Sequence, residues 1–111
     1  MGNWKLASPD QTLALDVDAS GATGTMNGTL NCLGISYRVT GGWDASGSVP
    51  GRNFSAFALS GDNGATAPNW IAATGIMTGP GNAPTQIDIQ VEVSSSSDGT
   101  LNHYKGVLVP A

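Results

Sequence analysis

Charged residues are scarce in this sequence. Its 111 residues include 4 Lys or Arg and 8 Asp or Glu, or 11% charged in all, and the formal net charge is −4. An average domain carries roughly 25% charged residues. The four cations, Lys5, Arg38, Arg52 and Lys105, are too few to form the cationic surface that phosphate backbones require. We therefore expect no nucleic-acid partner.

Long apolar runs and helix-forming stretches are missing as well. No apolar run approaches the roughly 20 residues of a membrane-spanning helix, so no membrane partner is expected. Glycine or proline interrupts every window long enough for three helical turns. The opening residues lack a charged region followed by an apolar core, so we expect no signal peptide in this sequence.

Cys32 is the only cysteine, which excludes an intrachain disulfide and a cysteine-based metal site. The simplest interpretation of Cys32 is a small core residue. The alternative is a bridge between two copies of Cys32 across a dimer axis.

A catalytic set is also missing. His103 is the only histidine, and no nucleophile-elbow pattern accompanies it. Most of the acidic residues fall in expected turns or on polar strand faces. Asp16 and Asp18 share one face, but no loop with calcium-binding spacing accompanies them. We expect no enzymatic activity, no cofactor and no metal.

Period-two alternation is the strongest pattern that is present. Between 86 and 93 every odd residue is branched and apolar and every even one is polar, as in a strand with one buried face. Turn residues, including many of the 16 glycines and 6 prolines, separate such runs at short intervals. The third of these turns is expected at 27–31. Eight strands are predicted, near 3–7, 12–18, 22–28, 33–43, 52–60, 69–78, 86–94 and 102–109.

This pattern predicts one all-β domain over residues 1–111. Eight short antiparallel strands joined by hairpins fit an up-and-down barrel or a sandwich. We favour the barrel because closure removes exposed sheet edges, which a chain with so few charges would otherwise have to protect. The interior of such a barrel holds either packed side chains or one small ligand.

Seven short motifs follow one another along nearly the whole chain. They are Gly2-Asn3-Trp4, Gly24-Thr25-Met26, Tyr-Arg-Val-Thr-Gly-Gly-Trp-Asp at 37–44, Phe-Ser-Ala at 54–56, Asn69-Trp70, Ile-Asp-Ile-Gln-Val at 87–91, and Tyr-Lys-Gly-Val-Leu-Val at 104–109. In type and order they resemble the strand motifs of the avidin and streptavidin family. The resemblance implies an eight-stranded up-and-down barrel that binds biotin in its open end. It also implies a secreted protein, extracellular or periplasmic, that assembles as a dimer or tetramer.

Several positions depart from the family pattern where the family contacts biotin. Leu6 and Met26 stand where the family has polar side chains. Asp10 lies within one residue of a further position that is polar in the family. Val91 stands in place of a tryptophan. Losing three hydrogen bonds to the ureido group would cost about 4–9 kcal/mol. The resemblance therefore implies weakened biotin binding, or binding of a related apolar ligand.

Two functions are left open at this point. The first is a small-molecule site lined by Leu6, Met26, Trp70, Val91, Val93 and Tyr104, with Asp10 or Asn69 as its polar anchor. In this family a neighbouring subunit usually contributes the aromatic residue that Tyr104 would replace. The second is a carbohydrate-binding or protein-interaction module that uses the loops of the same barrel. Its residues would be Trp43-Asp44, the Gly-Asp-Asn-Gly loop at 61–64 and Asn82.

Overall fold

The computed structural model describes residues 2–45, 53–80 and 83–111, and this part of the chain is all-β. Its strands are β1 (Gly2–Ala7), β2 (Leu13–Ala19), β3 (Thr25–Cys32), β4 (Ile35–Trp43), β5 (Phe54–Asp62), β6 (Asn69–Thr78), β7 (Gln86–Ser95) and β8 (Leu101–Pro110). Each strand pairs antiparallel with its neighbour in sequence, and β8 pairs with β1. The predicted up-and-down barrel is confirmed.

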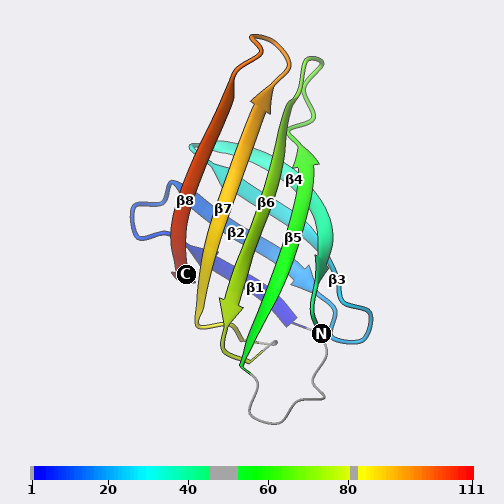
Figure 1. The fold of residues 1–111 in the computed structure, drawn as a ribbon, viewed down its shortest axis with the longest axis vertical. Coiled ribbons are helices and arrows are strands. Elements are labelled where there is room, and N and C mark those ends of the chain that lie inside the picture. The colour runs from blue at the N-terminus through cyan, green and yellow to red at the C-terminus, as the bar shows by residue number, and fades with distance from the viewer. Residues whose placement is uncertain (1, 46–52, 81–82) are drawn as a thin grey trace.

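The barrel is flattened, with principal extents of 48 × 28 × 18 Å. In Figure 1, β5 to β8 run side by side across the front, and β1 to β4 cross behind them. The loop between β5 and β6 and the hairpin between β7 and β8 lie together at the top of that view.

Inward-pointing side chains fill most of the interior. Ile87, Ile89, Val91 and Val93 are buried, as the alternation predicts. The same cluster includes Trp4, whose ring packs edge-on against Trp43 and Phe57, with centroids 5.1 and 6.0 Å apart. The middle of the barrel is therefore a packed hydrophobic core.

Strand boundaries agree with expectation to within two residues except at β3. The turn predicted at 27–31 is wrong, because β3 continues to Cys32 and turns at Leu33-Gly34. Gly28 lies inside the strand, opposite Val17 and Val39. A Cβ at Gly28 would overlap the backbone oxygen of Asp16, so this glycine permits close packing of strands and does not mark a turn.

The closure between β1 and β8 is short. Only Leu6 and Ala7 pair with Pro110 and Val109, whereas β6 and β7 pair from Asn69↔Ser95 to Thr78↔Gln86. If the β1–β8 register continued, Val107 would face Pro9. Proline has no N–H to donate, and the chain already turns there. The barrel is thus closed at one end of this seam only.

Candidate functional site

One cavity lies at the end of the barrel where the β3–β4, β5–β6 and β7–β8 connections meet. Its volume is about 190 Å³, and we call it the mouth cavity. The amide of Ser96 donates to the carbonyl of Pro68 at 3.2 Å, which joins two of these connections. The lining residues are Cys32, Leu33, Ile35, Tyr37, Asn69, Val93, Ser95, Asp98, Thr100, Asn102 and Tyr104.

A pair of polar side chains is held at the wall of the mouth cavity. Asn69 Nδ2 donates to the hydroxyl of Tyr37 at 3.4 Å, and Tyr37 is otherwise buried. The backbone N–H of Asn69 donates to Asn63 Oδ1 at 3.0 Å, which fixes the start of β6. The cavity therefore offers an amide and a phenol beside apolar surface, an arrangement typical of small-ligand sites.

Cys32 also lines the mouth cavity, and its free thiol is buried. Burial raises the pKa of the thiol, because desolvation disfavours the thiolate. A protonated thiol is a poor nucleophile. The simpler interpretation of Cys32, a small core residue, is the one that the structure supports.

The structure divides the eight residues proposed from the sequence into separate groups. Asn69, Val93 and Tyr104 line the mouth cavity, and Tyr104 does so in its own chain and not from a neighbouring subunit. The other five lie elsewhere: Leu6, Met26 and Val91 in the packed core, Trp70 on the outer surface with 53% of its area exposed, and Asp10 in the turn after β1. Tyr37, Cys32 and Asn102 were not proposed. The alternation of Asn102 with Tyr104 could have indicated that they share a face.

Asp10 and Asp98 have structural roles in exposed turns. Asp10 Oδ1 accepts from the hydroxyls of Ser8 (2.7 Å) and Thr12 (2.8 Å). Asp98 Oδ1 accepts from the Thr100 hydroxyl at 2.7 Å and its amide at 3.0 Å. These bonds stabilise the carboxylates and lower the pKa of both groups.

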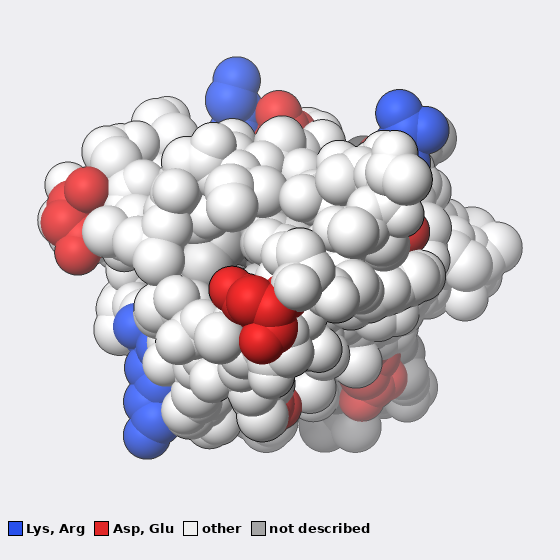
Figure 2. Space-filling model, turned by 90° about the horizontal axis from the view of Figure 1, so that it is seen from above, with Lys and Arg blue, Asp and Glu red and all other residues white. Residues whose placement is uncertain are grey.

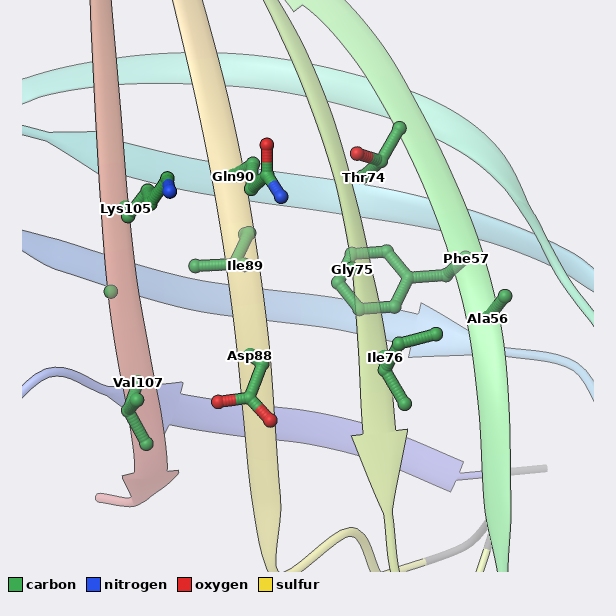
Figure 3. Close-up of a pocket in the computed structure, with 11 residues that line it drawn as sticks. Ala56, Phe57, Thr74, Gly75, Ile76, Asp88, Ile89, Gln90, Lys105 and Val107 are labelled. Carbon is green, nitrogen blue, oxygen red and sulfur yellow. The ribbon is translucent and has the colours of Figure 1, made fainter.

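A second hollow, which we call the outer groove, crosses the outside of β5 to β8. Its volume is about 680 Å³. In Figure 3, Asp88 on β7, Lys105 on β8 and Ile76 on β6 stand on the outward face of the sheet, whereas Phe57 and Ile89 belong to its buried face. Gly75 and Gly106 also line it, and a Cβ on either glycine would point inward, against the Phe57 ring and Leu13 respectively. Phe54, Ile76, Val107 and Val109 are exposed on the same face.

A third hollow, the polar cleft, lies where β5 leaves β4, and it has a volume of about 370 Å³. Arg38 and Asp62 are direct cross-strand partners at this point. Asp62 Oδ1 accepts from the amide of Gly64 at 2.8 Å. Within the described residues the guanidinium of Arg38 forms neither a hydrogen bond nor an ion pair. The remaining lining residues are Thr29, Ser36, Tyr37, Asn63 and Gly64.

The other loop residues proposed for sugar binding are less suitable. Trp43 is half-buried, and its Nε1 donates to the carbonyl of Ser20 at 3.1 Å. It therefore packs partly against the core and is less exposed than the sugar-binding hypothesis assumed. Asn82 lies outside the described residues.

At the end of the molecule that carries the mouth cavity, charged side chains do not gather into one patch. Seen from the end of the molecule at the top of Figure 1, they stand apart on a mostly uncharged surface (Figure 2). Over the described ranges, no three His, Cys, Asp or Glu residues are close enough to hold a metal ion together. The same part of the chain contains no helix of the length and apolarity needed to cross a membrane.

No protein-family model, curated protein or solved structure matches this chain.

Proposed function

We propose that this protein is a non-enzymatic small-molecule-binding barrel of the avidin type, whose ligand site is the mouth cavity. The observation that supports this is the position of that cavity. It is the only hollow described above that opens into the barrel, and it combines Tyr37, Asn69 and Asn102 with the apolar Val93 and Ile35.

The size of the mouth cavity limits the ligand. At about 190 Å³ it is smaller than the ≈ 300–1,000 Å³ typical of ligand pockets, so a ligand would be only partly enclosed. Leu6, Met26 and Val91 are buried in the core, do not line the cavity and offer no side-chain hydrogen bonds. We therefore propose weak binding of biotin or of a related apolar ligand by a secreted protein, extracellular or periplasmic.

Titration with biotin, with hexanoic acid as the apolar comparison, tests the proposal. We expect saturable shifts of the Asn69 and Asn102 side-chain amide signals in NMR spectra at millimolar ligand. Val93→Phe should abolish these shifts by filling the cavity, and Tyr104→Ala should weaken binding. The matched control is Trp70→Ala, which removes an aromatic ring from the outer surface and should leave binding unchanged.

Two results would overturn the proposal. One is the absence of saturable shifts with either ligand while the protein remains folded. The other is a shift that survives Val93→Phe and disappears in Trp70→Ala, which would place the ligand outside the barrel.

We also propose that the protein is a homo-oligomer that assembles through the outer groove face. This face exposes Phe54, Ile76, Val107 and Val109 between the small residues Ala56, Ala58 and Ala72. Asp88 and Lys105 also stand on this face. The outer face of β1 to β4 is more polar and carries Asn3, Lys5, Asp16, Asp18 and Asn27. Burial of apolar area favours contact through the first face.

Sedimentation velocity tests the assembly. Ile76→Lys should convert the oligomer to monomer, because it places a charge in the middle of the buried face. Leu101→Lys, at an exposed leucine outside the groove, is the control and should leave the oligomer intact. A wild-type protein that stays monomeric at high micromolar concentration contradicts the proposal.

A second candidate function, carbohydrate binding, is favoured by the polar cleft. Arg38 and Asp62 stand opposite each other without forming an ion pair within the described residues. Between them they offer hydrogen-bond donors and an acceptor to neighbouring hydroxyls of a neutral sugar. Glycan-array binding that is lost in Arg38→Gln and kept in Lys5→Gln would support this function. Absence of binding to every glycan on the array would contradict carbohydrate binding.

A further inference from the structure

Among the residues that the structure describes, no strand pairs with the β1 side of β8 over most of its length. β8 pairs with β7 from Leu101 to Leu108, but with β1 only at Val109 and Pro110. The β1–β2 turn closes on itself, since Ser8 exchanges hydrogen bonds with Leu13. We call the free side of residues 101–107 the open edge.

Two backbone hydrogen bonds show which groups point to the open edge. The N–H of Ser95 on β7 donates to the carbonyl of Thr100, and the N–H of Ala111 donates to the carbonyl of Lys5 on β1. In an antiparallel ladder successive residues direct their N–H and C=O groups to opposite sides. Even-numbered residues of β8 therefore bond to β7, and odd-numbered residues face the β1 side. The open edge therefore presents the backbone N–H and C=O groups of Leu101, His103, Lys105 and Val107.

The exposure of β8 agrees with this assignment. His103, Lys105 and Val107 are exposed, and Asn102, on the inward face, is exposed as well. Tyr104 is half-buried. A strand in the middle of a sheet over a packed core would bury Asn102 and Tyr104. An unpaired strand of this kind is a template for the addition of another strand.

We propose that the open edge binds an extended peptide, which adds antiparallel to β8 and continues the barrel wall above β1. Peptide residues opposite Lys105 and His103 would lie on the outer face, where an acidic side chain complements the ammonium group of Lys105. A residue opposite Tyr104 would face inward, toward the mouth cavity and its apolar walls Val93 and Ile35. A residue opposite Gly106 would also face inward, toward the buried side chain of Leu13. The preferred segment therefore alternates acidic or hydroxyl side chains with apolar ones.

A second copy of β8 fits this edge less well than a peptide. In a two-fold pairing centred on Lys105, the two lysines would face each other and repel. Exposed lysine on an edge strand opposes pairing between identical copies. The same lysine favours a segment with an acid at the matching position. The proposal rests on backbone groups and does not depend on small-molecule binding in the mouth cavity.

Amide hydrogen exchange of the free protein is the first test. Amides of His103, Lys105 and Val107 should exchange much faster than those of Asn102, Tyr104 and Gly106, which bond to β7. Equal protection of the two sets would show that the edge is covered, and would overturn the proposal. Odd-numbered amides that gain protection only as the protein concentration rises would assign the edge to a second copy, and would also overturn it.

The second test uses the peptide acetyl-Thr-Val-Glu-Val-Thr-amide, with glutamate to pair opposite Lys105. Binding should protect the three odd-numbered amides. Methylating the glutamate nitrogen should weaken binding about tenfold, because it removes a hydrogen bond to β8. Methylating a valine nitrogen, which faces away from β8, is the matched control. Replacing glutamate by lysine should weaken binding to wild type and restore it to Lys105→Glu.

Proline variants separate binding from folding. His103→Pro removes an N–H that faces the open edge and no bond to β7, so the protein should keep its thermal midpoint and lose peptide affinity. Tyr104→Pro breaks the β7 ladder and should destabilise the fold. Failure of wild type to bind the peptide, or undiminished binding by folded His103→Pro, contradicts the proposal.

Discussion

At the scale of single residues, two aspartates stabilise their turns through one carboxylate oxygen each. The pKa of Asp10 is lowered by hydrogen bonds from the Ser8 and Thr12 side chains and the Thr12 backbone, and that of Asp98 mainly by the Thr100 hydroxyl and amide. A lowered pKa means that the folded state favours the charged form. This stability is fully present above the ordinary pKa of 3.8 and is lost as the pH falls through the lowered values.

We predict that the urea midpoint of unfolding decreases as the pH falls below about 4. The double variant Asp10→Asn with Asp98→Asn should flatten this decrease, because neither amide titrates. Urea titrations at a series of acidic pH values measure the effect. A double variant with the same acid dependence as wild type would assign the decrease to other groups.

Close approach between strands also limits which side chains some positions can carry. A Cβ at Gly61 would overlap the carbonyl oxygen of Arg38, whereas a Cβ at Gly21 would meet nothing within 4 Å. We predict that Gly61→Ala lowers the free energy of unfolding by about 1–3 kcal/mol. Gly21→Ala should change it by less than about 0.5 kcal/mol. Chemical denaturation of both variants tests the difference, and equal stabilities would show that β4 and β5 can separate without cost.

At the scale of elements, the β3–β4 hairpin carries strain in a two-residue turn. Leu33 and Gly34 have φ values of 51° and 83°, as in a type I′ turn, which favours asparagine followed by glycine. Leucine at positive φ is disfavoured by about 1–2 kcal/mol. The exposed side chain of Leu33 gains little burial in return.

Leu33→Asn should therefore stabilise the protein by about 1 kcal/mol and raise its thermal midpoint by a few degrees. Leu101→Asn makes the same change at another exposed leucine, outside the positive-φ region, and should be nearly neutral. Differential scanning calorimetry compares the two. Equal midpoint shifts would show that the effect comes from replacing an exposed leucine by asparagine and not from the turn.

The elements were predictable from the sequence to the extent that alternation determined them. The run from 86 to 93 indicates both a strand and its buried face, and β7 has both. β3 was misplaced because Asn27-Gly28 resembles a turn, whereas the sheet uses Gly28 where two backbones approach closely. Such a contact between distant segments leaves no local signal.

The candidate site was less predictable than the strands. Motif resemblance placed Trp70 in a cavity, but β6 carries Asn69 and Ile71 on its inner face and Trp70 on its outer face. Both faces of β6 contain apolar residues, so alternation alone could not choose between them. The mouth cavity also depends on where β1 stops pairing with β8, which is a property of the closed sheet.

At the scale of the whole molecule, stability depends on which side of the barrel wall a side chain occupies. Leu108 and Val107 are neighbours on β8, with exposed fractions of 0% and 46%. Leu108→Ala should cost about 2–5 kcal/mol, because it leaves a cavity in the core. Val107→Ala should cost the monomer no more than about 0.5 kcal/mol, because the side chain is exposed in the single chain. Denaturant titration measures both, and similar losses would mean that the interior is not packed as described.

The short pairing between β1 and β8 also determines how the barrel responds to tension. Gly2 and Ala111 lie on neighbouring strands toward the same end of the molecule. A force that separates them acts in the unzipping geometry, so the few backbone hydrogen bonds between β1 and β8 are loaded one after another. In a shear geometry these bonds would be loaded together. Once β8 is free from β1, we expect the same force to peel β8 from β7. The remaining strands should then detach one at a time, beginning with β7. A barrel with a well-packed core is thus mechanically soft along the line that joins its two termini.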